Sequence, residues 1–100
     1  MAQISRIKLR PEVWEKIFDL FSKTLAGITD KKVLNSFMED FFTPTERIMF
    51  AKRIAVAVLL AKDNNYSTIR TMIKVSPSTI TKISNILKSD RSGLKEIVTK

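Results

Sequence analysis

Residues 43–62 read T-P-T-E-R-I-M-F-A-K-R-I-A-V-A-V-L-L-A-K and predict one long helix. Thr43 can cap the first turn, Pro44 suits the first helical position, and Glu46 stands where a capping box needs it. Residues 54–61 are apolar at every position, which predicts a helix buried on all sides. Eight residues are too few to cross a bilayer. Because 100 residues can hardly surround such a helix, we expect a second copy of the chain to help cover it.

The composition narrows the class of protein. With 100 residues, 44% of them hydrophobic, the chain suggests a single globular domain. Cysteine and histidine are absent. This rules out disulfides, makes a zinc site very improbable and removes the usual general base. Carboxylates are scattered and only two glycines occur. We therefore expect no enzyme, no cofactor and no metal. Residues 1–10 lack the apolar core of a secretory signal, so we expect a cytoplasmic protein without membrane association.

Positive charge increases along the chain. The net charge is +8: residues 1–40 contribute +1, residues 41–65 contribute +2 and residues 66–100 contribute +5. Residues 66–89 hold four basic side chains and no acidic one. Such a balance favours a polyanionic partner, most often nucleic acid, although it also serves ordinary solubility.

Two helices are expected before the central one. Pro11 opens the first, Gly27 ends it, and Asp30 or Thr29 caps the second. The first helix has an apolar stripe of Trp14, Ile17, Phe18, Phe21 and Leu25. The second has one of Val33, Leu34, Phe37, Met38 and Phe41. Stripes of this kind are typical of core packing, so residues 11–62 are the predicted dimerisation core.

The two ends of the chain are less informative. Residues 1–10 form a basic arm with Arg6, Lys8 and Arg10, which either frays or touches DNA phosphates; fraying is the simpler interpretation. Residues 91–100 are expected to form a last short helix or a frayed tail.

Residues 66–88 follow a break at 63–65 and predict two short helices, 66–73 and 77–88, joined by a turn. Ser76 caps the second helix and Pro77 occupies its first position. The inner face is expected to hold Ile69, Ile73, Ile80, Ile83 and Leu87. The outer faces show Ser78, Thr79, Thr81, Lys82, Ser84, Asn85 and Lys88. This arrangement predicts a helix-turn-helix. Small polar residues at the start of the second helix let its backbone approach the major groove, where their hydroxyls reach base edges. The alternative is two ordinary helices with a solvated face.

The pieces T-P-T-E-R-I-M-F-A-K-R-I and Y-S-T-I-R-T-M-I-K-V-S-P-S-T-I-T-K-I-S-N-I-L-K resemble the Trp repressor-like family. The resemblance covers about residues 10–90 and is nearer to the less characterised Gram-positive-type relatives than to the tryptophan-binding members. It implies an all-α, intertwined homodimer. In that fold the first and central helices form a shared core, and a helix-turn-helix head projects from each side. Residues 11–90 would be one such domain.

The resemblance also implies which residues meet double-stranded DNA. The family's reading positions fall on Pro77, Ser78 and Thr81 at the start of the second head helix. Flanking support falls on Thr68, Arg70, Lys74 and Ser76. We expect Ser78 and Thr81 to face bases, while the phosphates are met by Arg70, Lys74, Lys82 and Lys88. Thr79 and Asn85 complete the set. Lys74 stands where relatives often have glycine, so the turn is expected to differ there.

The effector site departs from that of the tryptophan-binding members. In those, two arginines hold the amino-acid carboxylate and a glycine leaves room for the indole. Arg53 matches the first arginine, but Lys82 replaces the second and loses its planar fork. Ile83 replaces the glycine, and Ile86 replaces a serine that helps to hold the amino group. The linker before the head is also one residue shorter. We predict that tryptophan does not bind: either Ile83 holds the head permanently in place or another ligand is used. For Arg53, a salt bridge within the chain or across the dimer is an equal alternative.

The sequence favours a homodimeric transcriptional regulator that binds double-stranded DNA, most simply a repressor. The alternative is a protein-interaction or antitoxin-like module that uses the same head. RNA binding belongs to the first class, but Tyr66 alone offers no aromatic stacking platform. A strong loss of affinity with salt would support a nucleic-acid partner.

Overall fold

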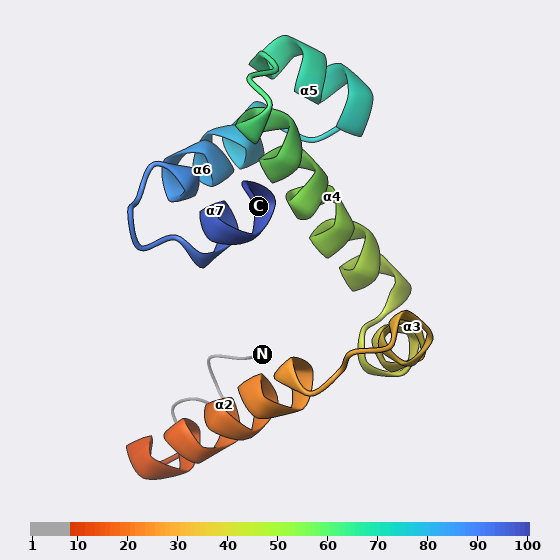
Figure 1. Cartoon of the computed structure of the whole chain (residues 1–100). Helices are drawn as coiled ribbons and strands as arrows, with labels where there is room; N and C mark the ends of the chain where they lie inside the picture. Colours follow the sequence, from red (N-terminus) through yellow and green to blue (C-terminus); the bar gives the residue numbers. More distant parts are fainter. Residues whose placement is uncertain (1–8) are drawn as a thin grey trace. The chain divides into compact units, whose positions relative to one another are not determined.

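The computed structural model of the chain describes residues 9–100, which form six α-helices and no strand (Figure 1). The helices are α2 (Pro11–Ala26), α3 (Lys31–Phe41), α4 (Pro44–Ala61), α5 (Tyr66–Ile73), α6 (Pro77–Leu87) and α7 (Gly93–Val98). The predicted all-α class is confirmed. The chain divides into two compact units, and the division falls between Phe41 and Phe42. Of the predicted basic arm, Arg6 and Lys8 lie outside the described residues.

Prolines and short polar side chains set the helix starts. Pro11, Pro44 and Pro77 each stand at the beginning of their helix, where a missing N–H leaves no hydrogen bond unmade. The predicted capping box of α4 is confirmed: Thr43 Oγ1 accepts from the Glu46 N–H at 3.1 Å, and the Thr43 N–H donates to Glu46 Oε1 at 2.8 Å. Both bonds satisfy donors that would otherwise be unpaired at the helix end.

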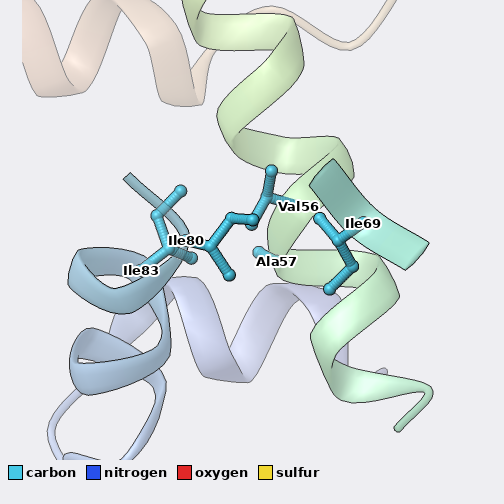
Figure 2. Packing of buried hydrophobic residues seen from close by; sticks show 5 residues of the cluster. All are labelled: Val56, Ala57, Ile69, Ile80 and Ile83. Atoms are coloured by element: carbon cyan, nitrogen blue, oxygen red, sulfur yellow. The ribbon is translucent and has the colours of Figure 1, made fainter. Parts of the chain in front are cut away.

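The core lies in the second unit, residues 42–100. Five side chains are buried there, from α4, α5 and α6: Val56, Ala57, Ile69, Ile80 and Ile83 (Figure 2). Leu94 and Val98 bring α7 against the same core. Helices α5, α6 and α7 therefore all pack on the second half of α4, and α7 is part of this unit.

In the first unit, the described residues 9–41 form no comparable core. Neither α2 nor α3 buries a single side chain within the chain. Their aromatic rings contact one another at the surface, as in the stacked pairs Trp14–Phe18, with centroids 4.9 Å apart, and Phe21–Phe41, at 5.9 Å. An apolar groove of about 250 Å³ is lined by Ile17, Leu20, Phe21, Thr24, Phe37 and Phe41. The predicted stripes are present, but within one copy of the chain their side chains are exposed or only half-buried.

Burial of the central helix is one-sided in the single chain. Only Val56 and Ala57 of α4 are fully buried. Ile48 is 57% exposed and Ile54 is 47% exposed. Burial on all sides, as expected for residues 54–61, is thus not reached within one copy.

Over residues 9–100, no helix combines the length and the apolar character needed to cross a membrane.

Candidate nucleic-acid interface

The turn between α5 and α6 is tight and left-handed. Lys74, directly after α5, has φ 62° and ψ 52°, and its N–H donates to the Arg70 carbonyl oxygen at 2.9 Å. Glycine adopts this conformation most readily, whereas a side chain makes it less favourable. Lys74 therefore follows a path suited to glycine and adds strain at a point where the chain must reverse.

A cluster of hydroxyl groups begins α6. Ser76 Oγ accepts from the Thr79 N–H at 3.3 Å and lies 3.1 Å from Ser78 Oγ and 3.0 Å from Thr79 Oγ1. The predicted cap by Ser76 is confirmed. Because the cap engages the hydroxyls of Ser76, Ser78 and Thr79, they are held close to the helix end. Thr81, one turn further on, is exposed.

Most residues predicted to bind DNA lie on the accessible surface of the head, which is α5, the turn and α6. The exposed ones are Arg70, Lys74, Ser76, Pro77, Ser78, Thr81, Lys82, Asn85 and Lys88. Thr68 and Thr79 are half-buried. The same two helices bury Ile69, Ile80 and Ile83, so the predicted inner and outer faces of the head are separated as expected.

The charge on this surface is unopposed. The ion pairs within residues 9–100 are Arg10–Glu12, Lys23–Asp19 and Lys95–Asp90. In the described chain, none of the predicted phosphate-binding cations pairs with a carboxylate. Near the start of α6, a shallow depression of about 180 Å³ is lined by Tyr66, Ser67, Arg70, Pro77 and Ile80. The surface is suited to receive a polyanion, because its cations are not already neutralised by neighbours.

The predicted effector residues do not share one cavity. Arg53 lines a depression of about 140 Å³ together with Met49, Lys52, Val75 and Thr79. Ile83 instead belongs to the core and is 4% exposed, while Ile86 is 43% exposed. Lys82 is exposed on the outer face of α6.

Arg53 contacts an aromatic ring within its own chain. Its Cζ atom lies 5.7 Å from the centroid of the Phe50 ring, which is a cation–π distance. No carboxylate of residues 9–100 pairs with it. The salt bridge that we considered for Arg53 is therefore not formed within the described part of one chain, and a bridge across a dimer stays a prediction.

The head is fastened to α4 at its junction. Asp63, just after α4, has a positive φ of 64°. The backbone N–H and the side-chain Nδ2 of Asn64 both donate to the Leu59 carbonyl oxygen, each at 3.0 Å. Asn65 then caps α5 by accepting from the Thr68 N–H at 2.8 Å. The short polar residues that predicted a break thus form a well-bonded corner rather than a loose linker.

Some contributors to the site are not apparent in the sequence. The ammonium of Lys52, in the middle of α4, donates to the Lys74 carbonyl oxygen at 3.3 Å. Leu94 and Val98 support the head from α7. The bond from Lys52 could not be predicted, because Lys52 is far from the turn in sequence. For α7 there was a signal, since the apolar spacing in residues 94–98 indicates a helix with one apolar face.

The described residues, 9–100, hold no group of three or more histidine, cysteine, aspartate or glutamate side chains that could bind a metal ion.

Comparison with known families identifies a match. The family model described as Trp repressor protein matches residues 14–100 and therefore spans most of α2 and every later helix. No curated protein and no solved structure matches the chain.

Proposed function

Because the chain belongs to the Trp repressor family, a family of helix-turn-helix DNA-binding regulators, we propose that it is a sequence-specific regulator that acts as a homodimeric repressor. In this proposal α6 enters the major groove of double-stranded DNA. Ser78 and Thr81 face base edges, and phosphates are met by Arg70, Lys74, Lys82 and Lys88.

The observation that carries the proposal is the outer face of α6. It is exposed, rich in hydroxyl groups and flanked by cations without acidic partners. The helix begins at Pro77 with Ser76 as its cap, so its positive dipole end carries Ser78. A groove binder needs this combination, since phosphate contacts position the helix while hydroxyl groups distinguish bases.

The exposed apolar surface supports the homodimer. Phe18 is 58% exposed, Phe41 55% and Ile48 57%, and the groove between α2 and α3 is lined almost entirely by apolar side chains. Exposed apolar surface of this extent marks an association site. A second copy of the chain would supply matching stripes, because a twofold interface uses the same patch on both partners.

The burial of Ile83 supports independence from tryptophan. Its side chain packs with Val56 and Ile80 between α4 and α6 (Figure 2). The contact between central helix and reading helix is thereby made by the protein itself. A small amino acid is not needed to hold α6 in place, so we propose that the head is competent without an effector.

The test is selection of bound duplexes from a random pool without added amino acid. We expect a pseudo-palindromic consensus whose half-sites lie about one DNA turn, roughly 34 Å, apart. Thr81→Ala should blur the consensus at one position in each half-site, because it removes a base-facing hydroxyl. Thr99→Ala is the matched control, since Thr99 follows α7 and its hydroxyl donates to the Lys95 carbonyl oxygen. Added tryptophan should leave the affinity unchanged.

Two results would contradict the proposal. One is a pool without enrichment and without salt-sensitive binding. The other is a tryptophan-dependent consensus, which would refute effector independence alone.

A second candidate function is a protein-interaction or antitoxin-like module. It is favoured by two exposed apolar side chains on the head, Met72 at 59% and Ile86 at 43%. A protein partner would bind with little dependence on salt, whereas DNA affinity falls steeply as salt rises. Met72→Ser would weaken binding of the protein partner and leave the DNA consensus unchanged.

A further inference from the structure

We propose that Lys52 is a positioning residue for α6, because its ammonium holds the turn from which α6 begins. The inference rests on the proposed function, in which α6 reads DNA. Lys52 would act through the turn and would touch neither base nor phosphate.

The geometry joins the middle of α4 to the head. Lys52 Nζ lies 3.3 Å from the carbonyl oxygen of Lys74, a residue 22 positions later. The Lys52 side chain is half-buried and lines the depression that Val75 and Thr79 also line. The ammonium therefore bonds to the turn, and its stem lies beside the depression that the turn and the first turn of α6 share.

The chemistry suits a cation at this place. The Lys74 carbonyl follows the last turn of α5, where carbonyl groups lack helical partners and the helix dipole is negative. An ammonium on a long stem can donate to such a carbonyl without entering the helix. Within residues 9–100, the bond from the Lys52 ammonium to the Lys74 carbonyl oxygen is the side-chain hydrogen bond that links α4 to the head.

The turn needs support because of its backbone. Lys74 has a φ of 62°, a conformation that disfavours residues with a side chain. Ser76, the cap of α6, follows two residues later. If the turn relaxed, the cap and the start of α6 would shift together, and the base-facing side chains would move with them. A small displacement would reduce discrimination between sequences more than it reduces attraction to phosphates.

The first experiment compares affinity for the selected duplex with affinity for a scrambled duplex at several salt concentrations. Lys52→Met keeps most of the stem and removes the ammonium, whereas Lys52→Arg keeps a cationic donor. Lys62→Met is the control, because it also removes one positive charge. Lys62 is the C-terminal cap residue of α4. We expect Lys52→Met to lower the affinity ratio about two- to fivefold. The salt slope should stay unchanged, Lys52→Arg should recover most of the ratio, and Lys62→Met should leave it intact.

Two outcomes would overturn the proposal. If the slope of log affinity against log salt falls by about 0.9 while the ratio holds, Lys52 is a phosphate ligand. If Lys52→Met changes neither quantity, the contact does not position α6.

A second experiment needs no DNA. Trypsin cleaves after Lys74 only when the turn opens, and cleavage follows the population of the open form when reclosing is fast. We expect cleavage at Lys74 to accelerate about two- to fivefold in Lys52→Met and not in Lys62→Met. An unchanged rate would refute the contact. If the native protein selects no duplex, the proposed function fails, and the protease result still decides whether Lys52 holds the turn.

A double-mutant cycle tests most directly whether Lys52 acts through the turn. Lys74→Gly makes the left-handed turn favourable by itself, so the turn should depend less on Lys52. The loss of sequence preference caused by Lys52→Met should therefore be smaller in the Lys74→Gly background. An equal loss in both backgrounds would show that Lys52 does not act through the turn.

Discussion

The two units of the chain use similar apolar patterns to different ends. Helices α5 and α6 turn their stripes toward α4 and close a core with five buried side chains. Helices α2 and α3 have stripes of the same spacing and bury none of them. Amphipathic spacing therefore identifies the apolar face of a helix but not the molecule that covers it. In the second unit the same chain covers α5, α6 and part of α4, while Ile48 and Ile54 of α4 stay exposed. For these residues and for the first unit, we propose that the cover comes from another copy.

Charge divides along the same boundary. Residues 1–41 carry seven basic and six acidic side chains, a net +1, whereas residues 42–100 carry eleven and four, a net +7. The unit with its own core is also the one that would approach a polyanion. The unit with exposed apolar surface is free of the strong like-charge repulsion that would oppose association of two copies.

The largest effect should come from the core of the second unit. Ile80 is fully buried, so Ile80→Ala should lower the free energy of unfolding by about 2–5 kcal/mol. Ile97→Ala on α7 is the control, because Ile97 is 67% exposed and its truncation should change stability by no more than about 0.5 kcal/mol. Urea denaturation of both variants measures the difference. Equal losses would mean that the two isoleucines do not differ in burial, and the contrast between closed core and open surface would fail.

The next effect concerns the first unit. Phe18 is 58% exposed in the single chain, so Phe18→Ala should cost little there. In the proposed dimer only the exposed part of the ring is newly buried, so the change removes about 1–2 kcal/mol per copy and would raise the dissociation constant by roughly thirtyfold or more. Sedimentation should show native dimers of twice the 11.4 kDa chain mass at concentrations where the variant is monomeric. A native protein that is a compact monomer would remove the proposed role of the first unit.

The smallest expected effect on stability concerns Thr43, the cap at the start of α4. Thr43→Ala removes the hydroxyl that accepts from the Glu46 N–H, and the free energy of unfolding should fall by about 1 kcal/mol. Thr43→Ser keeps an equivalent oxygen and should retain most of that stability. Thermal denaturation of the three proteins gives the order. If Thr43→Ser loses as much as Thr43→Ala, the methyl group of threonine matters rather than the cap.

The helix boundaries could be predicted because they depend on local chemistry. Prolines at residues 11, 44 and 77 and the caps at Thr43 and Ser76 act within one turn of the chain. The separation of inner and outer faces in residues 66–88 followed from spacing alone. The structure confirms it for buried Ile69, Ile80 and Ile83, whereas Thr79 and Ser84, expected outside, are half-buried.

The rest depends on contacts between residues far apart in the chain. No local pattern indicates that Lys52 reaches the Lys74 carbonyl oxygen, because the path of the intervening corner decides it. Spacing placed Ile83 on the inner face of the head, but that it packs in one core with Val56 and Ala57 of α4 required the fold. The contact of Arg53 with the Phe50 ring was predictable from local spacing. Phe50 stands three residues earlier on the same helix, where side chains are neighbours.

The length of the central helix sets the distance between its capped start and the core of the head. Its capped start at Thr43 and its buried residues Val56 and Ala57 belong to one unbroken rod, α4, and about 13 residues at 1.5 Å each separate them by roughly 20 Å. In the proposed dimer this length sets how many base pairs lie between the two half-sites of an operator. One residue inserted before Val56 would rotate the head by about 100° around the helix axis. If the proposed dimer binds DNA in this way, the operator's spacer would be encoded in a segment that need never touch DNA. A change in that segment alone would then redirect the protein to differently spaced sites.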